Sequence, residues 1–170
     1  MKEFLIIDGY NIIFAWPEFE KLTESGLEHA RSKLVGIMAN HSPLSGQKIV
    51  IVFDAYQHNN IVGHIEIIDG IEVVYTQQGE TADALIERLV GDFAKEGIVY
   101  VATSDWAEQM IIFGRGAYRL TPDELRTQVI QYKQEVKEHW SDIKPTDSYL
   151  ENRLLDTVRL KLEEWRRKDK

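Results

Sequence analysis

Five acidic residues in this chain follow apolar segments, and carboxylates in such an arrangement could hold a metal ion. Asp8, Asp54 and Asp105 each lie at or just beyond the end of an apolar run, and Glu80 and Asp83 follow a fourth run. Carboxylate oxygens are hard ligands suited to Mg²⁺ or Mn²⁺. Such an ion lowers the pKa of a bound water and neutralises charge on a leaving oxygen, so the pattern favours metal-assisted phosphodiester hydrolysis.

The apolar runs themselves are typical of strands that are buried on both faces of a parallel sheet. They are Phe4–Asp8, Lys48–Asp54, Ile71–Tyr75 and Gly97–Ala102. The carboxyl ends of parallel strands meet at one edge of the sheet, where open α/β sheets bind their ligands. The sequence therefore predicts an α/β fold that gathers all five acids at this edge.

Each acid alone also has an ordinary structural explanation. Asp8 could start a turn with Asn11 as a helix cap, and Ser104 could cap the helix that follows it. If a helix opens at Glu80, then Glu80 and Asp83 would share a face and complement the helix dipole. The recurrence of acids after four elements favours a site. Asn11 could then bind a ligand or phosphate, and Ser104 could position a water.

In the segments between these strands, apolar residues recur at the spacing of a helix. It predicts helices over about Leu27–Asn40, from Glu80 to Phe93 and over Trp106–Phe113, with a loop at Ser42–Gly46. A short strand is expected near His64–Ile68 and an edge strand at Ala117–Leu120. A capping box at Thr121–Glu124 starts a long helix to about Trp140. We expect one domain over residues 1–145, with an amphipathic C-terminal helix within residues 146–170 packed on it.

The composition restricts where in the cell we expect the protein and which reactions it could catalyse. The chain of 170 residues has no cysteine, which excludes disulfides and thiolate chemistry. There is no apolar run long enough to span a membrane and no signal-peptide pattern, so we expect a cytoplasmic protein. The net charge of −8 argues against a nucleic-acid partner. However, cations bound among clustered acids would offset that charge locally.

The acid motifs together resemble the YacP-like branch of the NYN domains, which are PIN-like ribonucleases. They read Asp8-Gly-Tyr-Asn11, Phe53-Asp54-Ala55, Glu80-Thr-Ala-Asp83 and Thr103-Ser-Asp105. The resemblance implies a three-layer α/β/α domain, a site for Mg²⁺ or Mn²⁺, and endonucleolytic cleavage of RNA. It also implies mRNA engaged by the ribosome as the substrate.

The same resemblance implies roles for individual residues. Asp8 and Asp83 would be the main catalytic acids and metal ligands, supported by Asn11 and by Asp105, which would also bind metal. Asp54 and Glu80 match further acidic positions of the metal site. Beyond these motifs, a rim of later residues could face RNA, with Ser104, Arg115, Arg119 and Tyr118 as candidates for substrate binding. A solvated helix face is the ordinary explanation for the later positive charge.

Two other functions also use some of these features. An aspartyl-phosphate phosphatase has strand-end acids, but it would need a second aspartate two residues after Asp8, where Tyr10 stands. A non-catalytic RNA- or ribosome-binding module could keep the same fold without turnover. Metal-dependent cleavage of RNA would distinguish the nuclease from both.

Overall fold

Six strands form one central sheet in the order β3-β4-β2-β1-β5-β6. The computed structural model describes residues 1–54 and 62–142. The strands are β1 (Lys2–Asp8), β2 (Lys48–Phe53), β3 (His64–Ile68), β4 (Ile71–Tyr75), β5 (Gly97–Ala102) and β6 (Tyr118–Leu120). β3 runs antiparallel to β4, and all other neighbouring pairs are parallel. The predicted, mainly parallel sheet is confirmed.

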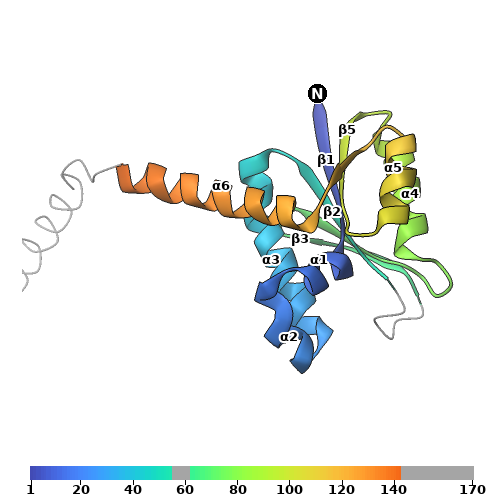
Figure 1. Cartoon of the computed structure of the whole chain (residues 1–170), viewed down its shortest axis with the longest axis horizontal. Coiled ribbons are helices and arrows are strands. Elements are labelled where there is room, and N and C mark those ends of the chain that lie inside the picture. The colour runs from blue at the N-terminus through green and yellow to red at the C-terminus, as the bar shows by residue number, and fades with distance from the viewer. Residues whose placement is uncertain (55–61, 143–170) are drawn as a thin grey trace, which may run out of the picture. The chain divides into compact units, whose positions relative to one another are not determined.

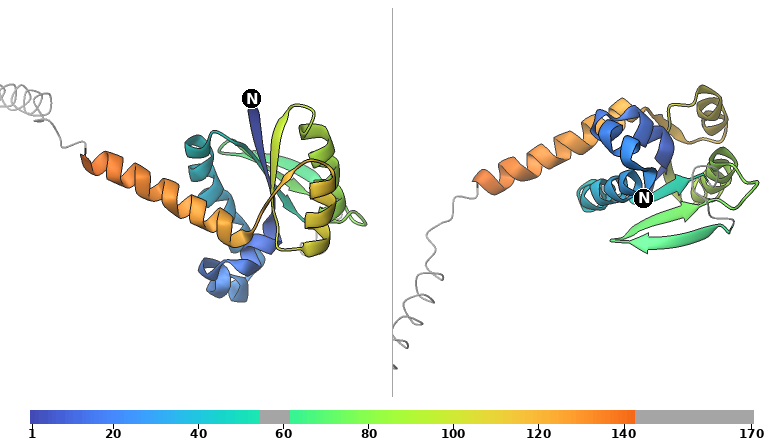
Figure 2. Two further views of the ribbon diagram at one scale, coloured as in Figure 1. Left: turned by 45° about the horizontal axis from the view of Figure 1, so that its top comes forward. Right: turned by 90° about the horizontal axis from the view of Figure 1, so that it is seen from below.

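Helices cover both faces of this sheet (Figures 1 and 2). They are α1 (Gly9–Ala15), the 3-10 helix η1 (Pro17–Phe19), α2 (Glu20–Ser25), α3 (Leu27–Ser45), α4 (Ala82–Phe93), α5 (Trp106–Gly114) and α6 (Pro122–Asp142). α1, α2 and α3 lie on one side of the sheet, and α4 and α5 lie on the other. The fold is therefore the three-layer α/β/α arrangement that the resemblance implied.

β1 is buried on both faces because its side chains alternate between two cores. Leu5 and Ile7 belong to the core that includes Leu34 of α3, and Phe4 and Ile6 belong to the core that includes α4. All four side chains are at most 3% exposed. This explains why the strand reads as a continuous apolar run from Phe4 to Ile7, directly before Asp8.

The strand register brings the carboxyl ends together at one edge. On one side of β1, Asp8 pairs with Val52 of β2, and on the other side Ile7 pairs with Ala102 of β5. The residues that follow β1, β2 and β5 therefore leave the sheet side by side. This edge carries the predicted acids.

Two predicted helix boundaries are wrong. α3 continues through the expected loop to Ser45 and ends at Gly46, whose φ of 70° is left-handed and whose N–H donates to the Ser42 carbonyl. Pro43 lies inside this last turn. α4 begins at Ala82 rather than Glu80, because the Thr81 hydroxyl caps it by accepting from the Ala84 N–H at 3.2 Å. η1 and α2 were not predicted.

The capping box at the start of α6 is confirmed. The Thr121 N–H donates to Glu124 Oε2 at 2.7 Å, and the Glu124 N–H donates back to Thr121 Oγ1 at 3.2 Å. Contacts divide the chain into a unit over Met1–Lys133 and a second unit over Gln134–Lys170. The C-terminal helix predicted within residues 146–170 lies outside the described residues. Within the described ranges, no helix is both long and apolar enough to cross a bilayer.

Candidate active site

Asp8 is the most deeply buried acid at the carboxyl edge of the sheet. It ends β1, caps α1, and is 6% exposed. Its Oδ1 accepts the Asn11 N–H at 3.2 Å, and its Oδ2 accepts the Asn11 Nδ2–H at 2.6 Å. Asn11 thus binds both oxygens of the carboxylate and fixes its orientation. The ordinary explanation, with Asn11 as the helix cap, is wrong in its residue, because Asp8 is the cap of α1 and Asn11 lies inside the helix. A cap needs only one of the two bonds that Asp8 accepts.

Gly9 lets the chain turn sharply from β1 into α1. A Cβ atom at this position would lie 2.3 Å from Cε1 of Phe53, whose side chain is fully buried. A contact this short is impossible without movement of the Phe53 ring. The absence of a side chain at position 9 therefore allows Asp8 and the end of β2 to lie close together.

Asp54 connects the end of β2 to the start of α4. Its Oδ2 accepts the backbone N–H of Ala82 at 3.0 Å. Ala82 is the first residue of α4, so this bond satisfies one of the helix's unpaired N–H groups. It holds the first turn of α4, and with it Asp83, at the same edge of the sheet as Asp8.

Four aspartates are close enough for their charges to interact. Burial is the main cause of the raised pKa of Asp8; hydrogen bonds from Asn11 lower it, and the charges of Asp83 and Asp54 raise it further. The pKa of Asp83 is also raised, first by burial and then by the charges of Asp105 and Asp54. Three strand ends and one helix start thus bring together Asp8, Asp54, Asp83 and Asp105.

Asn11 and Ser104 join the β1 end to the β5 end. The Ser104 hydroxyl donates to Asn11 Oδ1. Asn11 thus accepts from Ser104 with its oxygen and donates to Asp8 with its nitrogen. Next to Ser104, the Asp105 N–H donates to the hydroxyl of the buried Thr103 at 3.1 Å, which fixes the start of the segment that carries Asp105.

Other predicted site residues lie apart from these aspartates. Glu80 precedes the cap of α4 and pairs with Arg88 at 2.7 Å. Arg115 pairs with Glu87 and lies 3.5 Å from the Cβ position of Gly91, two turns along α4 from Asp83. The structure therefore does not bring Glu80 or Arg115 into the cluster.

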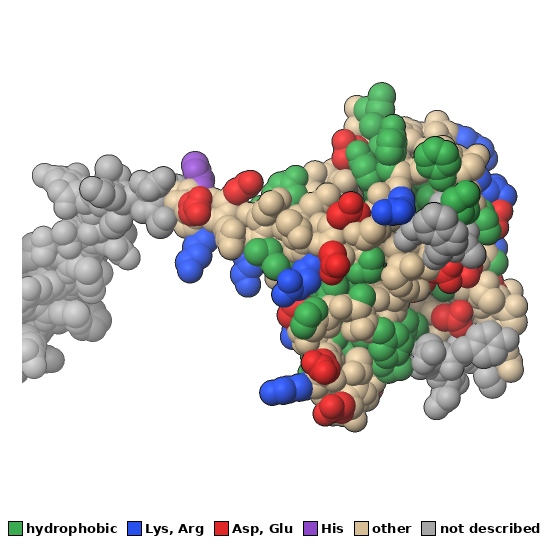
Figure 3. Space-filling view, in the orientation of Figure 1, with side chains coloured by type: hydrophobic (Ala, Val, Ile, Leu, Met, Phe, Trp, Pro, Cys, Tyr) green, Lys and Arg blue, Asp and Glu red, His purple; other side chains and the backbone are tan. Residues whose placement is uncertain are grey.

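Two further candidates for substrate binding lie on the edge strand β6. Tyr118 is 59% exposed, and its ring centroid lies 5.5 Å from that of Tyr100. Arg119 is also exposed. On the face shown in Figure 3, acidic and basic side chains are interspersed over the described part of the chain, with no continuous basic surface.

The described residues hold no group of three or more His, Asp or Glu side chains arranged closely enough to enclose a metal ion. The donor set nevertheless fits a hard divalent cation, because aspartates from three strand ends and one helix start share one region, where burial and then neighbouring carboxylates raise the pKa of Asp8 and of Asp83. Mg²⁺ is commonly held by one or two carboxylates together with waters and substrate phosphates. After burial, Asp83 is the neighbouring carboxylate that most raises the pKa of Asp8.

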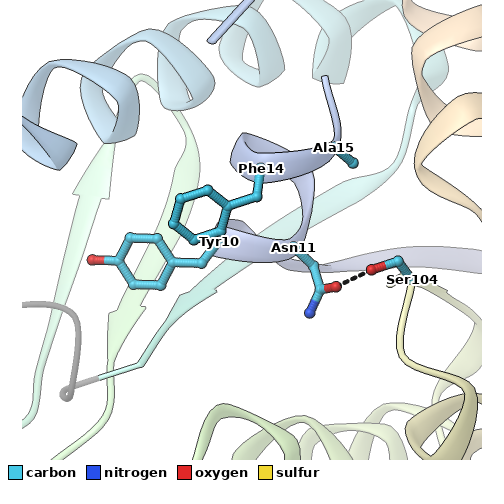
Figure 4. A pocket seen from close by; sticks show the side chains of 5 residues that line it. All are labelled: Tyr10, Asn11, Phe14, Ala15 and Ser104. Carbon is cyan, nitrogen blue, oxygen red and sulfur yellow. Dashed lines mark hydrogen bonds between the residues drawn. The ribbon is translucent and has the colours of Figure 1, made fainter. Parts of the chain in front are cut away.

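A pocket of about 290 Å³ opens beside Asn11 and was not predicted from the sequence. Figure 4 shows its lining residues, which are Tyr10, Asn11, Phe14, Ala15 and Ser104. The Tyr10 hydroxyl accepts from Arg31 Nη1 at 3.0 Å. The spacing of Tyr10 and Phe14, four residues apart, could have indicated an aromatic pair on one face of α1. Arg31 lies 21 residues from Tyr10 in the sequence, so no local pattern could have indicated their hydrogen bond.

A mainly parallel sheet between two helical layers, with aspartates at its carboxyl edge, defines the class of PIN-like α/β/α domains. The chain belongs to the YacP-like NYN domain family, whose model matches residues 5–167. That family is part of the PIN-like nuclease superfamily.

Relatives from Bacillus subtilis support this assignment. The chain is 33% identical over 170 residues to protein YacP of Bacillus subtilis (strain 168), with 98% of each chain covered. It is similar to the crystal structure of Rae1 (YacP) from Bacillus subtilis, with 31% identity, a TM-score of 0.69, and 98% of this chain and 95% of that chain covered. The crystal structure of a tryptophan-to-leucine mutant of the same Bacillus subtilis protein gives 33% identity and a TM-score of 0.72 over 91% of each chain.

Proposed function

We propose that this protein is a divalent-metal-dependent endoribonuclease that hydrolyses phosphodiester bonds in RNA. The observation that carries the proposal is the convergence of aspartates from three strand ends and from the start of α4, which Asp54 holds at this edge through the Ala82 N–H. Burial, and then the neighbouring carboxylates, raise the pKa of Asp8 and of Asp83 there. Like charges held together in a partly buried place destabilise one another unless a cation joins them. Perturbed groups clustered in this way are typical of functional sites.

In this proposal, Asp8 and Asp83 hold Mg²⁺ or Mn²⁺, and Asp105 and Asp54 complete the negative field around it. When bound, such an ion supplies an activated water and neutralises charge on the leaving oxygen. Asn11 keeps both oxygens of Asp8 in a fixed orientation, and Asp54 holds the start of α4 through the Ala82 N–H. The protein needs no covalent nucleophile for this reaction.

The substrate class rests on the family. Membership in the PIN-like nuclease superfamily favours a nucleic-acid substrate. The resemblance of the acid motifs implies that this substrate is RNA, and in particular mRNA engaged by the ribosome in the cytoplasm. The net charge of −8 fits such a substrate only if cations offset the acids where the phosphate binds. Binding of RNA is therefore expected to depend on the divalent ion.

A cleavage assay tests the proposal. End-labelled RNA, both naked and on translating ribosomes, is incubated with the protein and Mg²⁺ or Mn²⁺, and products are compared with those of Asp83→Asn. We expect internal cleavage by the wild type and a loss of at least about 100-fold in the variant. Asp92→Asn is the matched control, since Asp92 is an exposed acid of α4 paired with Lys95. Binding without cleavage on both substrates would instead indicate a non-catalytic RNA- or ribosome-binding module.

A further inference from the structure

The pocket beside Asn11 combines an exposed aromatic ring with polar groups that belong to the candidate active site. Phe14 is 61% exposed although it is a large apolar residue on a short helix whose other apolar side chains are largely buried. Asn11 and Phe14 are three residues apart and therefore share a face of α1. Figure 4 shows both side chains at the same pocket, with the Ser104 hydroxyl opposite.

The Phe14 ring packs against the ring of Tyr10. Its centroid lies 6.2 Å from that of Tyr10, with 27° between the ring planes, which is an offset stack. Tyr10 is itself only 5% exposed. Its hydroxyl accepts the hydrogen bond from Arg31, and its ring meets that of Phe53 edge to face, with the two ring centroids 5.1 Å apart. An aromatic ring that packs against a buried neighbour and keeps an exposed surface is a suitable platform for another planar group.

The polar side of the pocket offers hydrogen bonds to such a group. The Ser104 hydroxyl donates to Asn11 Oδ1, and a hydroxyl oxygen retains lone pairs that can accept. Asn11 connects this side of the pocket to Asp8. A ligand in the pocket would therefore lie one residue away from the carboxylate that is proposed to hold the metal ion. The volume of about 290 Å³ is near the lower end for small-ligand pockets and suits a single planar ring system.

We propose that this pocket binds one unpaired nucleobase of the RNA next to the scissile phosphate, with Phe14 as the stacking platform. The inference rests on the proposed function, because it names how the same site holds its substrate. It also predicts that the substrate is single-stranded at that position, since a paired base could not present its face to Phe14. Phe14 thus selects unpaired RNA, whereas the aspartates act on the phosphodiester.

The test uses the full-length chain with Asp83 intact, so that the proposed metal ligands are retained, and Ca²⁺ in place of Mg²⁺, an ion that carboxylate oxygens also bind; gel analysis shows that the RNA stays intact during the titration. Single-stranded RNAs of about eight nucleotides, each with the fluorescent base 2-aminopurine at one position, are titrated with the protein. Stacking quenches this fluorescence. We expect quenching at one position of the series, with affinity about five- to 100-fold weaker for Phe14→Ala and retained for Phe14→Tyr. Phe113→Ala, which removes another exposed phenylalanine on α5, should bind normally.

Cleavage assays of the same proteins with Mg²⁺ or Mn²⁺ separate failure of the inference from failure of the proposed function. If the wild type cleaves RNA but Phe14→Ala changes neither KM nor the quenching, the inference is wrong and the nuclease assignment stands. If quenching depends on Phe14 but the wild type does not cleave, the base pocket is confirmed and the nuclease assignment fails. Absence of both quenching and cleavage overturns both. Circular dichroism of Phe14→Ala shows whether the variant is folded, and Phe14→Tyr tests the pocket without loss of the ring.

Discussion

Asn11 donates to both oxygens of Asp8, through its backbone N–H at 3.2 Å and its side-chain Nδ2–H at 2.6 Å. The two residues are three apart in the sequence, across the junction of β1 and α1. Burial raises the pKa of Asp8, and the charges of Asp83 and Asp54 raise it further. The two hydrogen bonds from Asn11 lower it and so offset part of that increase. These bonds keep a buried carboxylate able to ionise and aimed in one direction.

Replacing Asn11 by alanine should therefore weaken metal binding rather than remove it. Loss of residues that orient metal ligands typically reduces metal affinity or activity by about 10- to 100-fold. We expect the Mn²⁺ concentration for half-maximal cleavage to rise by that factor in Asn11→Ala. Asn40→Ala, at an exposed asparagine of α3, is the control. An unchanged Mn²⁺ dependence in Asn11→Ala would show that Asn11 does not position Asp8.

Gly9→Ala should destabilise the protein because the new Cβ would lie 2.3 Å from the buried Phe53 ring. Overpacking of this kind costs about 1–3 kcal/mol. Gly36→Ala is the matched control, since no atom lies within 4 Å of that Cβ position in α3, and it should leave the protein equally or more stable. Urea unfolding measures both. Equal stability of Gly9→Ala and the wild type would contradict the close approach of β1 and β2 at this point.

As the pH is lowered, the rate of cleavage should begin to fall while the pH is still above 3.8, the ordinary pKa of an aspartate. The pKa values of Asp8 and Asp83 are both raised above 3.8, so protons compete with the metal ion at higher pH than for isolated carboxylates. At subsaturating Mn²⁺ the rate should rise with pH through these raised values and then level. A rate that stays constant down to about pH 4, with the protein still folded, would show that neither group titrates in the active site.

The same raised pKa values predict a stability effect of opposite sign to that of a salt-bridged acid. A carboxyl whose folded-state pKa is raised binds its proton more tightly in the folded state. Stability is therefore lost as pH rises from about 3.8 through the folded-state pKa, and the loss remains at neutral pH. Asp83→Asn should accordingly raise Tm at neutral pH in the absence of metal, whereas Asp92→Asn should not.

Addition of Mg²⁺ should make the wild type more stable than Asp83→Asn. A ligand at about 100 times its Kd stabilises by about 2.7 kcal/mol, which corresponds to roughly 5–10 °C in Tm for a domain of this size. The wild type and Asp92→Asn should show this increase, and Asp83→Asn should show little of it. Thermal unfolding followed by circular dichroism measures both effects. An equal increase in Asp83→Asn would place the stabilising ion elsewhere.

The strands and the positions of the aspartates could be predicted because both depend on local patterns. Apolar runs that are buried on both faces mark β1, β2 and β5, and parallel pairing then places Asp8, Asp54 and Asp105 at one edge. The sequence does not show which group caps a helix when two candidates are adjacent. Thr81 caps α4, so Glu80 lies outside the helix and pairs with Arg88.

The pocket could not be predicted because it depends on tertiary contacts. Ser104 reaches Asn11 across 93 residues of sequence, and Arg31 reaches Tyr10 across 21. Phe14 reads from the sequence as one more apolar residue of the segment after β1. Only the fold shows that its ring stays exposed beside Asn11.

The most direct test of the metal site is a crystal of the protein soaked in Mn²⁺ and measured for anomalous scattering. The account predicts an anomalous peak within bonding distance of carboxylate oxygens of both Asp8 and Asp83, and loss of that peak in Asp83→Asn. A peak bound by other residues, or no peak in crystals of a preparation that cleaves RNA, would contradict the assignment of these aspartates as the metal site.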